Sequence, residues 1–268
     1  MNVKPLRTLQ TAMGLLGDAV DGQYGEATRA LVTSTLARQN PATKTDWRSW
    51  PSERQAVLCL QVLSQRAGFV PGDLDGLWGP QTAFACDQLA YQQGHGEAPA
   101  PWRVEPVAPN PNAWPLERQE ELTAFYGPPG EANLVSMTLP YPLRLSWELG
   151  TVVQRTRCNA RVKDSLGRVL AAVLSHYGAA AVSELRLDVF GGGYNLRDKR
   201  GGSAMSTHAW GIAFDFDPDR NQLKWSDARA RFARSEYAAW WACWEAEGWV
   251  SLGRARNYDW MHVQAARV

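Results

Sequence analysis

Two short segments near the end of the chain have the alternating pattern of β-strands. In 212–217, Ile212, Phe214 and Phe216 alternate with small and acidic residues, and 260–264 has a similar strand-like composition. Because successive side chains of a strand point to opposite faces, Asp215 should face away from the aromatic side chains. We expect the two segments to form adjacent strands of one sheet.

Apolar residues at helical spacing predict longer elements before and between these strands. One helix is expected over 161–177, ended by Gly178, and a second over 226–247, ended by Gly248. His176 lies at the end of the first helix, where a cation suits the helix dipole, so we interpret it as a surface or structural residue.

The rest of this half of the chain predicts a mixture of helix and strand. A helix is expected over 116–125, and extended segments over 141–145 and 185–189. The pattern favours an α+β fold, with helices packed beside a small antiparallel sheet. Clustered tryptophans in the last predicted helix are more typical of a core than of a substrate platform. They are Trp240, Trp241 and Trp244.

Residues 1–95 contain a degenerate repeat. Segments 21–28 and 75–82 share the pattern D-G-x-[YW]-G-x-x-T, and a Leu-Gln pair precedes each of them. The glycines supply the backbone freedom that a tight turn needs, and Pro80 stands where a helix tolerates proline. Each copy therefore predicts a helix, a turn and a second helix.

Proline and glycine accumulate between this repeat and the α+β region. The composition predicts a semi-rigid, extended linker over 96–115. The expected domains are therefore 1–95 and 116–268, joined by that linker. His95 lies at its beginning and is not expected to bind a metal. Such a linker would let one domain stay on a polymer while the other samples bonds nearby.

Four residues in the last third of the chain suggest metal chemistry. His208, Asp215 and His262 are nitrogen and oxygen ligands that suit a catalytic zinc ion with a fourth position open to water. Asp259 would then be free to act as a base on that water. In a strand, residues three apart face opposite sides, so Asp259 can reach the metal only if the strand begins after it. Without a metal, the same residues would form a core strand with a hydrogen-bonded histidine, and Asp259 would be a capping or salt-bridged surface residue.

These residues resemble a known family. The pattern S-x-H-x-x-G-x-A-x-D from Ser206 to Asp215, followed by D-W-x-H at 259–262, is similar to that of the M15 zinc peptidases. The resemblance implies zinc on the two histidines and Asp215, with Asp259 as general base. It also implies an upstream arginine that stabilises the oxyanion, for which Arg197 is the best match and Arg200 a rival. Ser206 is expected to hydrogen-bond a metal ligand or the substrate.

The repeat resembles a second family, the small three-helix peptidoglycan-binding domain of wall hydrolases. The second copy is the better match, because a longer apolar loop precedes its turn. Tyr24 and Trp78 occupy the aromatic position of the repeat. We expect them to pack the turn against its own helices rather than to stack on sugars. The residues that would bind the wall stay undefined.

Composition narrows the class of protein. The net charge of +1 argues against a protein built to bind nucleic acid, and no apolar run approaches the roughly 20 residues of a membrane span. The N-terminus has no signal-peptide core, which predicts a protein that is made in and first stays in the cytoplasm. The cysteines are widely spaced and are expected to be free thiols in a monomer.

Together, the two resemblances predict a phage endolysin. Its expected activity is zinc-dependent hydrolysis of the peptidoglycan stem peptide at the L-Ala-D-Glu bond, after release from the host cytoplasm to the wall. A short aspartate as base favours the endopeptidases over the D-Ala-D-Ala carboxypeptidases. The competing hypotheses are a host wall-remodelling peptidase, a muramidase and a non-catalytic wall-binding protein. A muramidase would need a pair of catalytic carboxylates, and none stands out.

Overall fold

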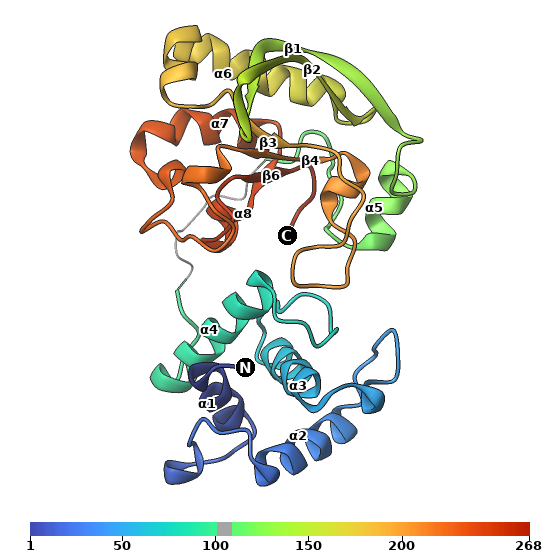
Figure 1. Cartoon of the computed structure of the whole chain (residues 1–268), viewed down its shortest axis with the longest axis vertical. Helices are drawn as coiled ribbons and strands as arrows, with labels where there is room; N and C mark the ends of the chain where they lie inside the picture. Colours follow the sequence, from blue (N-terminus) through green and yellow to red (C-terminus); the bar gives the residue numbers. More distant parts are fainter. Residues whose placement is uncertain (101–108) are drawn as a thin grey trace. The chain divides into compact units, whose positions relative to one another are not determined.

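The computed structural model describes residues 1–100 and 109–268. Contacts between Cα atoms divide these residues into two compact units, which we describe one at a time (Figure 1). The first contains the residues up to 100 together with 199–204, and the second contains the remainder. The middle of the predicted linker, 101–108, lies outside the described residues.

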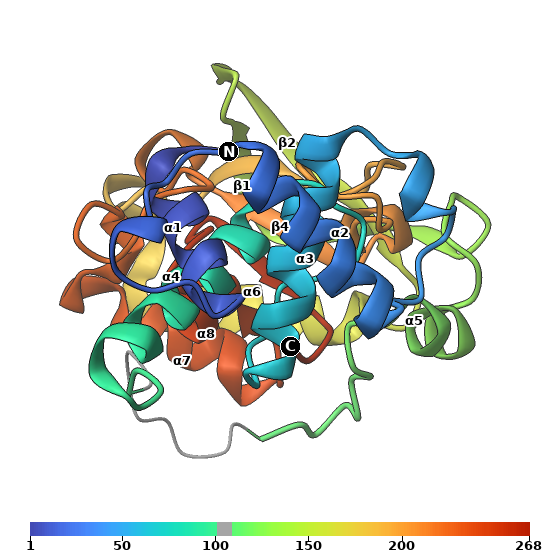
Figure 2. The ribbon, with the colours of Figure 1, turned by 90° about the horizontal axis from the view of Figure 1, so that it is seen from below.

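In the described residues, the first unit has four α-helices, two from each copy of the repeat (Figure 2). The expected three-helix type is not confirmed, because each of the two turns joins its own pair of helices. The α-helices are α1 (Val3–Ala12), α2 (Glu26–Gln39), α3 (Ser52–Arg66) and α4 (Pro80–His95), with the 3-10 helices η1 (Gly17–Ala19) and η2 (Trp47–Ser49).

A buried glutamine holds the turn of each repeat. The side-chain amide of Gln10 donates to the Asp21 carboxylate and the Thr28 hydroxyl, and its oxygen accepts the N–H of Gly22. Gly22 has a φ of 74°, in the region that favours glycine. Hydrogen bonds of one buried side chain thus join the first helix of the predicted helix–turn–helix to the turn and to the second helix.

The second repeat reproduces this network residue by residue. Gln61 donates to the Asp75 carboxylate and the Thr82 hydroxyl, and it accepts the N–H of Gly76. Gly76 has a φ of 68°, and a Cβ there would lie 2.6 Å from the Arg54 carbonyl oxygen. The equivalence confirms that the two segments are structural repeats, although the loop before the second turn is longer.

The two aromatic residues of the repeat differ in their surroundings. Tyr24 packs against the core of the first unit, and its hydroxyl donates to the carbonyl of Ser52. Trp78 keeps 40% of its surface exposed. The expected packing role therefore holds for Tyr24 and only in part for Trp78.

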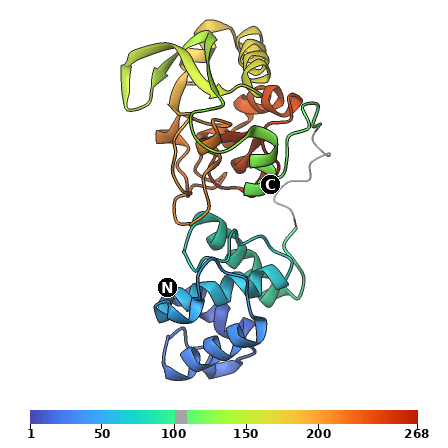
Figure 3. The ribbon, with the colours of Figure 1, turned by 90° about the vertical axis from the view of Figure 1, so that its right-hand side faces the viewer.

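The second unit is built on a six-stranded mixed sheet in the order β2-β1-β3-β4-β6-β5. All neighbouring strands are antiparallel except β1 and β3, so the expected wholly antiparallel sheet is wrong at this pair. A helix, α6, lies between β2 and β3 in the chain and provides the crossover that a parallel neighbour requires. Figure 3 shows β1 and β2 as a long hairpin. The strands are β1 (Leu134–Leu145), β2 (Glu148–Asn159), β3 (Val189–Gly192), β4 (Ala213–Phe216), β5 (Val250–Ser251) and β6 (His262–Gln264).

Helices of the second unit cover the sheet, with α6 packed against the β1–β2 hairpin (Figure 1). The arrangement is compatible with the expected α+β layout. The α-helices are α5 (Gln119–Tyr126), α6 (Lys163–Glu184), α7 (Ala238–Ala246) and α8 (Leu252–Arg256), and the 3-10 helices are η3 (Thr207–Trp210), η4 (Pro218–Arg220), η5 (Arg231–Ala233) and η6 (Ser235–Tyr237).

The helix α6 continues beyond its predicted end, but it is broken there. Gly178 has a φ of 72° and a ψ of 160°, which is not helical, so the expected stop is a kink between two helical stretches. By length and composition, α6 passes as a candidate membrane span, alone among the described helices. Part of this helix is nevertheless buried in the core of the second unit, through Leu166, Val169, Leu170, Val173 and Val182.

Two other predicted elements are shorter than expected. Of 226–247, only Ala238–Ala246 is α-helical, because loop contacts satisfy the backbone before it: the Phe232 N–H donates to the side chain of Asn221. The strand expected over 185–189 begins only at Val189, since the residues before it turn at the end of α6 and Arg186 has a φ of 62°.

The core of the second unit is rich in aromatic side chains. Trp240, Trp241 and Trp244 are 0%, 2% and 0% exposed, which confirms that they belong to the core. Phe216 of β4 contacts both Trp240 and Trp244, and Trp241 packs against Phe232 and Trp260. All four cysteines of the chain are free, as expected.

Candidate metal centre

Strands β4 and β6 carry two of the predicted ligands. Asp215 and His262 are directly opposite each other in this antiparallel pair. Phe214 and Phe216 are buried in the aromatic core, so Asp215 faces the other side of the sheet, as the alternation predicted. The core thus fixes the strand register, and the register brings the carboxylate and the imidazole together.

The third predicted ligand lies on the short helix η3, just before β4. Gly211 ends this helix with a φ of 68°, and a Cβ there would lie 3.0 Å from the backbone nitrogen of Asn159. The same nitrogen donates to the Gly211 carbonyl. This close approach to the end of β2 lets the chain reverse, so that the His208 ring faces Asp215.

The three side chains meet around one oxygen atom. Oδ1 of Asp215 lies 3.0 Å from Nδ1 of His262 and 3.4 Å from Nε2 of His208. The possible ligand atoms all lie within 4.8 Å of one another, and both histidines are buried. His208, Asp215 and His262 could therefore hold a metal ion.

The outer nitrogen of each imidazole is already engaged. Nδ1 of His208 lies 2.6 Å from the carbonyl oxygen of Gly193, which can only accept a hydrogen bond. Nε2 of His262 lies 3.0 Å from Oε1 of Gln264. A proton on each outer nitrogen leaves the inner nitrogen, which faces Asp215, with a lone pair for a metal ion.

Asp215 and His262 each stabilise the charged form of the other. Burial alone would raise the pKa of the Asp215 carboxyl, but the charges and hydrogen bonds of His208 and His262 outweigh it and hold this pKa below its usual range. For His262, burial lowers the pKa, but the hydrogen bond and charge of Asp215 and the charge of Asp259 raise it to about 9. The centre therefore holds a carboxylate beside a proton or another cation.

Asp259 is buried just before β6, with a φ of 56°. Its N–H donates to the carbonyl of Leu223, and its own carbonyl accepts the N–H of His262. Because β6 begins at His262, the two residues are not held on opposite faces of one strand. The structure meets the condition under which both could reach the same centre, and burial excludes an exposed Asp259.

The other residues expected at the site, Arg197, Arg200 and Ser206, lie in the segment between β3 and η3. Ser206 is buried, its N–H donates to the Arg197 carbonyl, and its own carbonyl accepts the N–H of Ala209. The Arg197 guanidinium is partly exposed and donates to the Asp198 carbonyl. Arg200 is exposed and lies in 199–204, the segment whose contacts assign it to the first unit.

The two remaining histidines do not belong to the metal-binding group found among the described residues. His95 is the last residue of α4 and stacks on Tyr91. His176 is exposed on α6. The exposure of His176 agrees with the surface or structural role expected for it, whereas His95 belongs to α4 and not to the predicted linker.

Two residues at the site, Gln264 and Glu117, were not predicted from the sequence. Gln264 accepts from His262, and the Gln264 amide donates to the Glu117 carboxylate. The period of a strand could have revealed Gln264, because residues 262 and 264 share a face. No local pattern points to Glu117, since it is 147 residues away in the chain.

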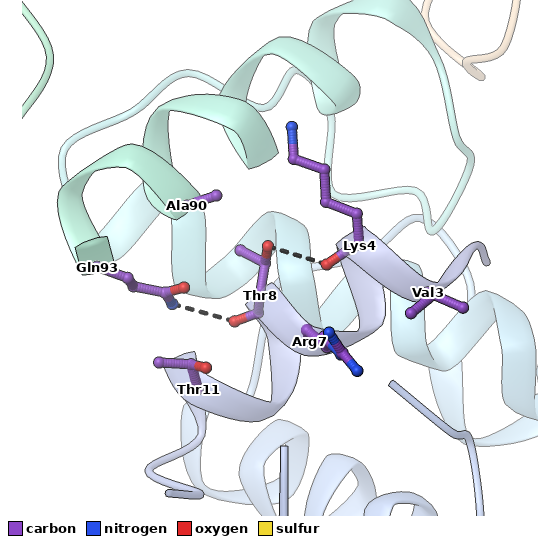
Figure 4. Close-up of a pocket in the computed structure, with 7 residues that line it drawn as sticks. All are labelled: Val3, Lys4, Arg7, Thr8, Thr11, Ala90 and Gln93. Carbon is purple, nitrogen blue, oxygen red and sulfur yellow. Dashed lines mark hydrogen bonds between the residues drawn. The ribbon is translucent and has the colours of Figure 1, made fainter. Parts of the chain in front are cut away.

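Within the first unit, an open pocket of about 440 Å³ lies between α1 and α4 (Figure 4). Polar side chains line it together with a larger share of apolar surface. Lys4 is paired with Asp87, and Gln93 of α4 donates to the backbone of Thr8 in α1. The lining residues are Val3, Lys4, Arg7, Thr8, Thr11, Ala90 and Gln93.

We compared the chain with models of protein families, with curated proteins and with solved structures, and none matched.

Proposed function

We propose that this protein is a zinc-dependent peptidase that hydrolyses the stem peptide of peptidoglycan, as a phage endolysin does. The observation that carries the proposal is the buried His208, Asp215 and His262 group, with the inner nitrogens of both imidazoles directed at one carboxylate oxygen. Two imidazoles and one carboxylate form a ligand set typical of catalytic zinc, which keeps one position open.

The choice of zinc is supported by the groups behind the ligands. Zinc-bound histidines usually donate their other N–H to a carbonyl or a carboxylate, and an amide oxygen serves equally as acceptor. Here the acceptors are the Gly193 carbonyl and Gln264. Imidazole also favours zinc over magnesium or calcium, which prefer oxygen ligands.

The remaining groups have complementary roles in the proposed reaction. A bound zinc ion would supply Lewis acidity and make a water molecule acidic near neutral pH. Asp259 takes the proton of the attacking water and delivers it to the leaving amine. Arg197, with Arg200 as its rival, stabilises the negative charge that develops on the substrate carbonyl oxygen. Ser206 orients a ligand or the substrate.

We further propose that residues 1–95 bind the wall and that 96–115 link them to a catalytic domain over 116–268. The paired helix–turn–helix units support this role by their resemblance to peptidoglycan-binding domains. The pocket between α1 and α4 offers hydroxyl, amide and guanidinium groups to a wall polymer (Figure 4). Tethering would raise the local concentration of catalytic domain at the wall.

Mass spectrometry of purified peptidoglycan after digestion tests the reaction. A new N-terminal D-Glu is expected, which identifies an L-alanyl-D-glutamate endopeptidase. Release of free D-Ala would instead identify a carboxypeptidase at the same metal centre. New reducing ends without peptide cleavage would indicate a muramidase, and an absence of any cleavage by the zinc-loaded protein would contradict the proposal.

A fragment of residues 116–268 tests the division of labour. We expect it to retain zinc and to clear intact walls more slowly than the full chain. Sedimentation with purified walls measures binding directly. Equal sedimentation of the fragment and the full chain would remove the binding role from residues 1–95.

A further inference from the structure

Gln264 is completely buried at the end of β6, and both ends of its side-chain amide are engaged. Its Oε1 lies 3.0 Å from Nε2 of His262 and accepts a hydrogen bond from the Thr207 hydroxyl at 3.3 Å. Its Nε2 donates to Oε2 of Glu117 at 3.0 Å and to the carbonyl of Ala266 at 3.2 Å. One amide thus links β6, the helix η3 and the segment before α5.

The surroundings allow only one orientation of this amide. A flipped Gln264 would place its oxygen against the Glu117 carboxylate and the Ala266 carbonyl, so three acceptors would face one another. The observed orientation matches both donors of the amide to acceptors. Its oxygen must therefore face His262, and Nε2 of His262 must be the donor.

The opposite tautomer of His262 has a good hydrogen bond of its own. Nδ1 of His262 lies 3.0 Å from Oδ1 of Asp215, so a proton on Nδ1 would be well bonded there. That proton would occupy the lone pair that a metal ion needs. At His208 the equivalent choice is made by a backbone carbonyl, that of Gly193, which substitution of a side chain cannot remove.

We propose that Gln264, oriented by Glu117, is a positioning residue that holds the proton of neutral His262 on Nε2 and so presents Nδ1 to the metal ion. Thr207 extends the effect, because its hydroxyl ties the element that carries His208 to the same amide oxygen. The inference rests on the proposed metal centre, and it adds two residues far apart in the chain to the determinants of metal affinity.

Substitution of Gln264 by leucine tests the role of the amide. Gln264→Leu removes the acceptor at Nε2 while keeping a side chain of similar size, so we expect zinc affinity to fall about 10–100-fold. Competition with a chromogenic chelator measures the affinity. In ¹⁵N-labelled zinc-bound protein, long-range ¹H–¹⁵N spectra should show the Nε2–H of His262 in the wild type. The variant should show that signal weakened or moved by the loss of its acceptor.

The matched control is Gln61→Leu, the same change at a buried glutamine of the first unit. It should lower stability and leave zinc affinity and the His262 signals unchanged. An effect of Gln61→Leu on zinc affinity equal to that of Gln264→Leu would show that the loss follows from destabilisation, and would overturn the proposal.

Exchanging the side chains of Gln264 and Glu117 distinguishes a role in positioning His262 from a role in packing. Gln264→Glu still offers His262 an acceptor but sets a carboxylate against Glu117, so zinc affinity should fall. The double variant Glu117→Gln, Gln264→Glu restores a donor facing an acceptor, and it should recover most of the lost affinity. Glu117→Gln alone should lose less than Gln264→Leu, because an amide oxygen at 117 can still accept from Gln264.

The decisive outcome is the rescue, which stays measurable even if Gln264→Leu does not fold. Recovery in the double variant, with the His262 Nε2–H signal restored, supports the positioning role. A loss of affinity in Gln264→Glu that the double variant does not recover overturns it, and wild-type affinity in Gln264→Glu overturns the orienting role of Glu117. If the wild-type protein binds no zinc, the proposed metal centre itself fails, and that result is distinguishable from failure of the positioning role alone.

Discussion

Buried glutamines organise both units of this protein, but their networks differ in kind. Around Gln10 and Gln61, the amide donors meet a carboxylate and a hydroxyl, and the amide oxygen meets the N–H of a glycine. These networks are closed, because each polar atom of the glutamine has a partner in the protein. Such networks stabilise a turn and have no need of a ligand.

The network around Gln264 instead ends at three atoms that can each accept a proton or bind a metal ion: one nitrogen of His208, one nitrogen of His262 and an oxygen of Asp215. With both outer imidazole nitrogens engaged, the inner nitrogens and the Asp215 carboxylate face one another and need a cation between them. A proton can fill this role, which explains the raised pKa of His262, and so can a metal ion. The comparison shows that buried polar groups can be fully matched within the protein, as around Gln10 and Gln61, or can meet at one point that could hold a metal ion, as around Asp215.

The largest effect on zinc binding and lysis should come from removing one of the histidines proposed to bind the zinc ion. His208→Ala or His262→Ala should abolish zinc binding and wall lysis, because two protein ligands do not hold a catalytic zinc ion. Zinc content by atomic emission and turbidity of wall suspensions measure the two losses. His95→Ala and His176→Ala are the controls and should keep both properties. Full lysis by metal-free wild-type protein would contradict a metal mechanism.

Substitution of Asp259 tests whether its buried carboxylate acts as a general base or as a metal ligand. Asp259→Asn should keep the fold and zinc but lower turnover by about a hundredfold or more, the scale expected for loss of a general base. Steady-state rates on a soluble muropeptide, with zinc content measured in parallel, provide the comparison. Loss of zinc would make Asp259 a ligand, and near-wild-type turnover would leave it a structural role.

The network around Gln264 and His262 should give two opposite trends with pH. As pH rises, the stability of the metal-free protein should fall and its affinity for zinc should rise. In the metal-free protein the pKa of His262 is raised from 6.5 to about 9, so its contribution to stability is complete below pH 6.5 and is lost as pH rises through 9. Zinc must displace this proton, so zinc affinity should rise by up to about tenfold per pH unit over the same interval. Calorimetric unfolding and chelator competition from pH 6 to 9 measure both trends. A zinc affinity independent of pH in this range would exclude His262 as the proton donor.

Substitutions in the closed networks around Gln10 and Gln61 should lower the stability of the protein without changing its zinc affinity. Gln61→Leu leaves the N–H of Gly76 without its acceptor, which should cost about 1–3 kcal/mol of unfolding free energy. Gln10→Leu should have a similar effect at Gly22, because the first network has the same bonds. Denaturant unfolding of the full chain measures these changes. Zinc affinity should not change in either variant, and a loss there would mean that the two networks are not independent.

Much of the fold near the candidate site follows from local sequence. The alternation around Phe214 and Phe216 predicts β4 and the outward direction of Asp215, because a strand has a period of two residues. The glycines of the repeat predict both turns, since Gly22 and Gly76 adopt positive φ angles that other residues rarely take. The same local rules failed over 226–237, where hydrogen bonds to the side chains of Asn221 and Asn257 replace those of a helix.

What the sequence by itself determined is therefore local: which residues alternate, which turn, and which side chains have the chemistry to bind a metal ion. Only the tertiary structure decided the parallel pairing of β1 with β3 and the choice of acceptor for each imidazole. Glu117 and Gln264 are 147 residues apart, and no periodicity connects them. The physical reason is that hydrogen-bond partners are selected by the packing of whole elements, whose long-range contacts no single segment specifies.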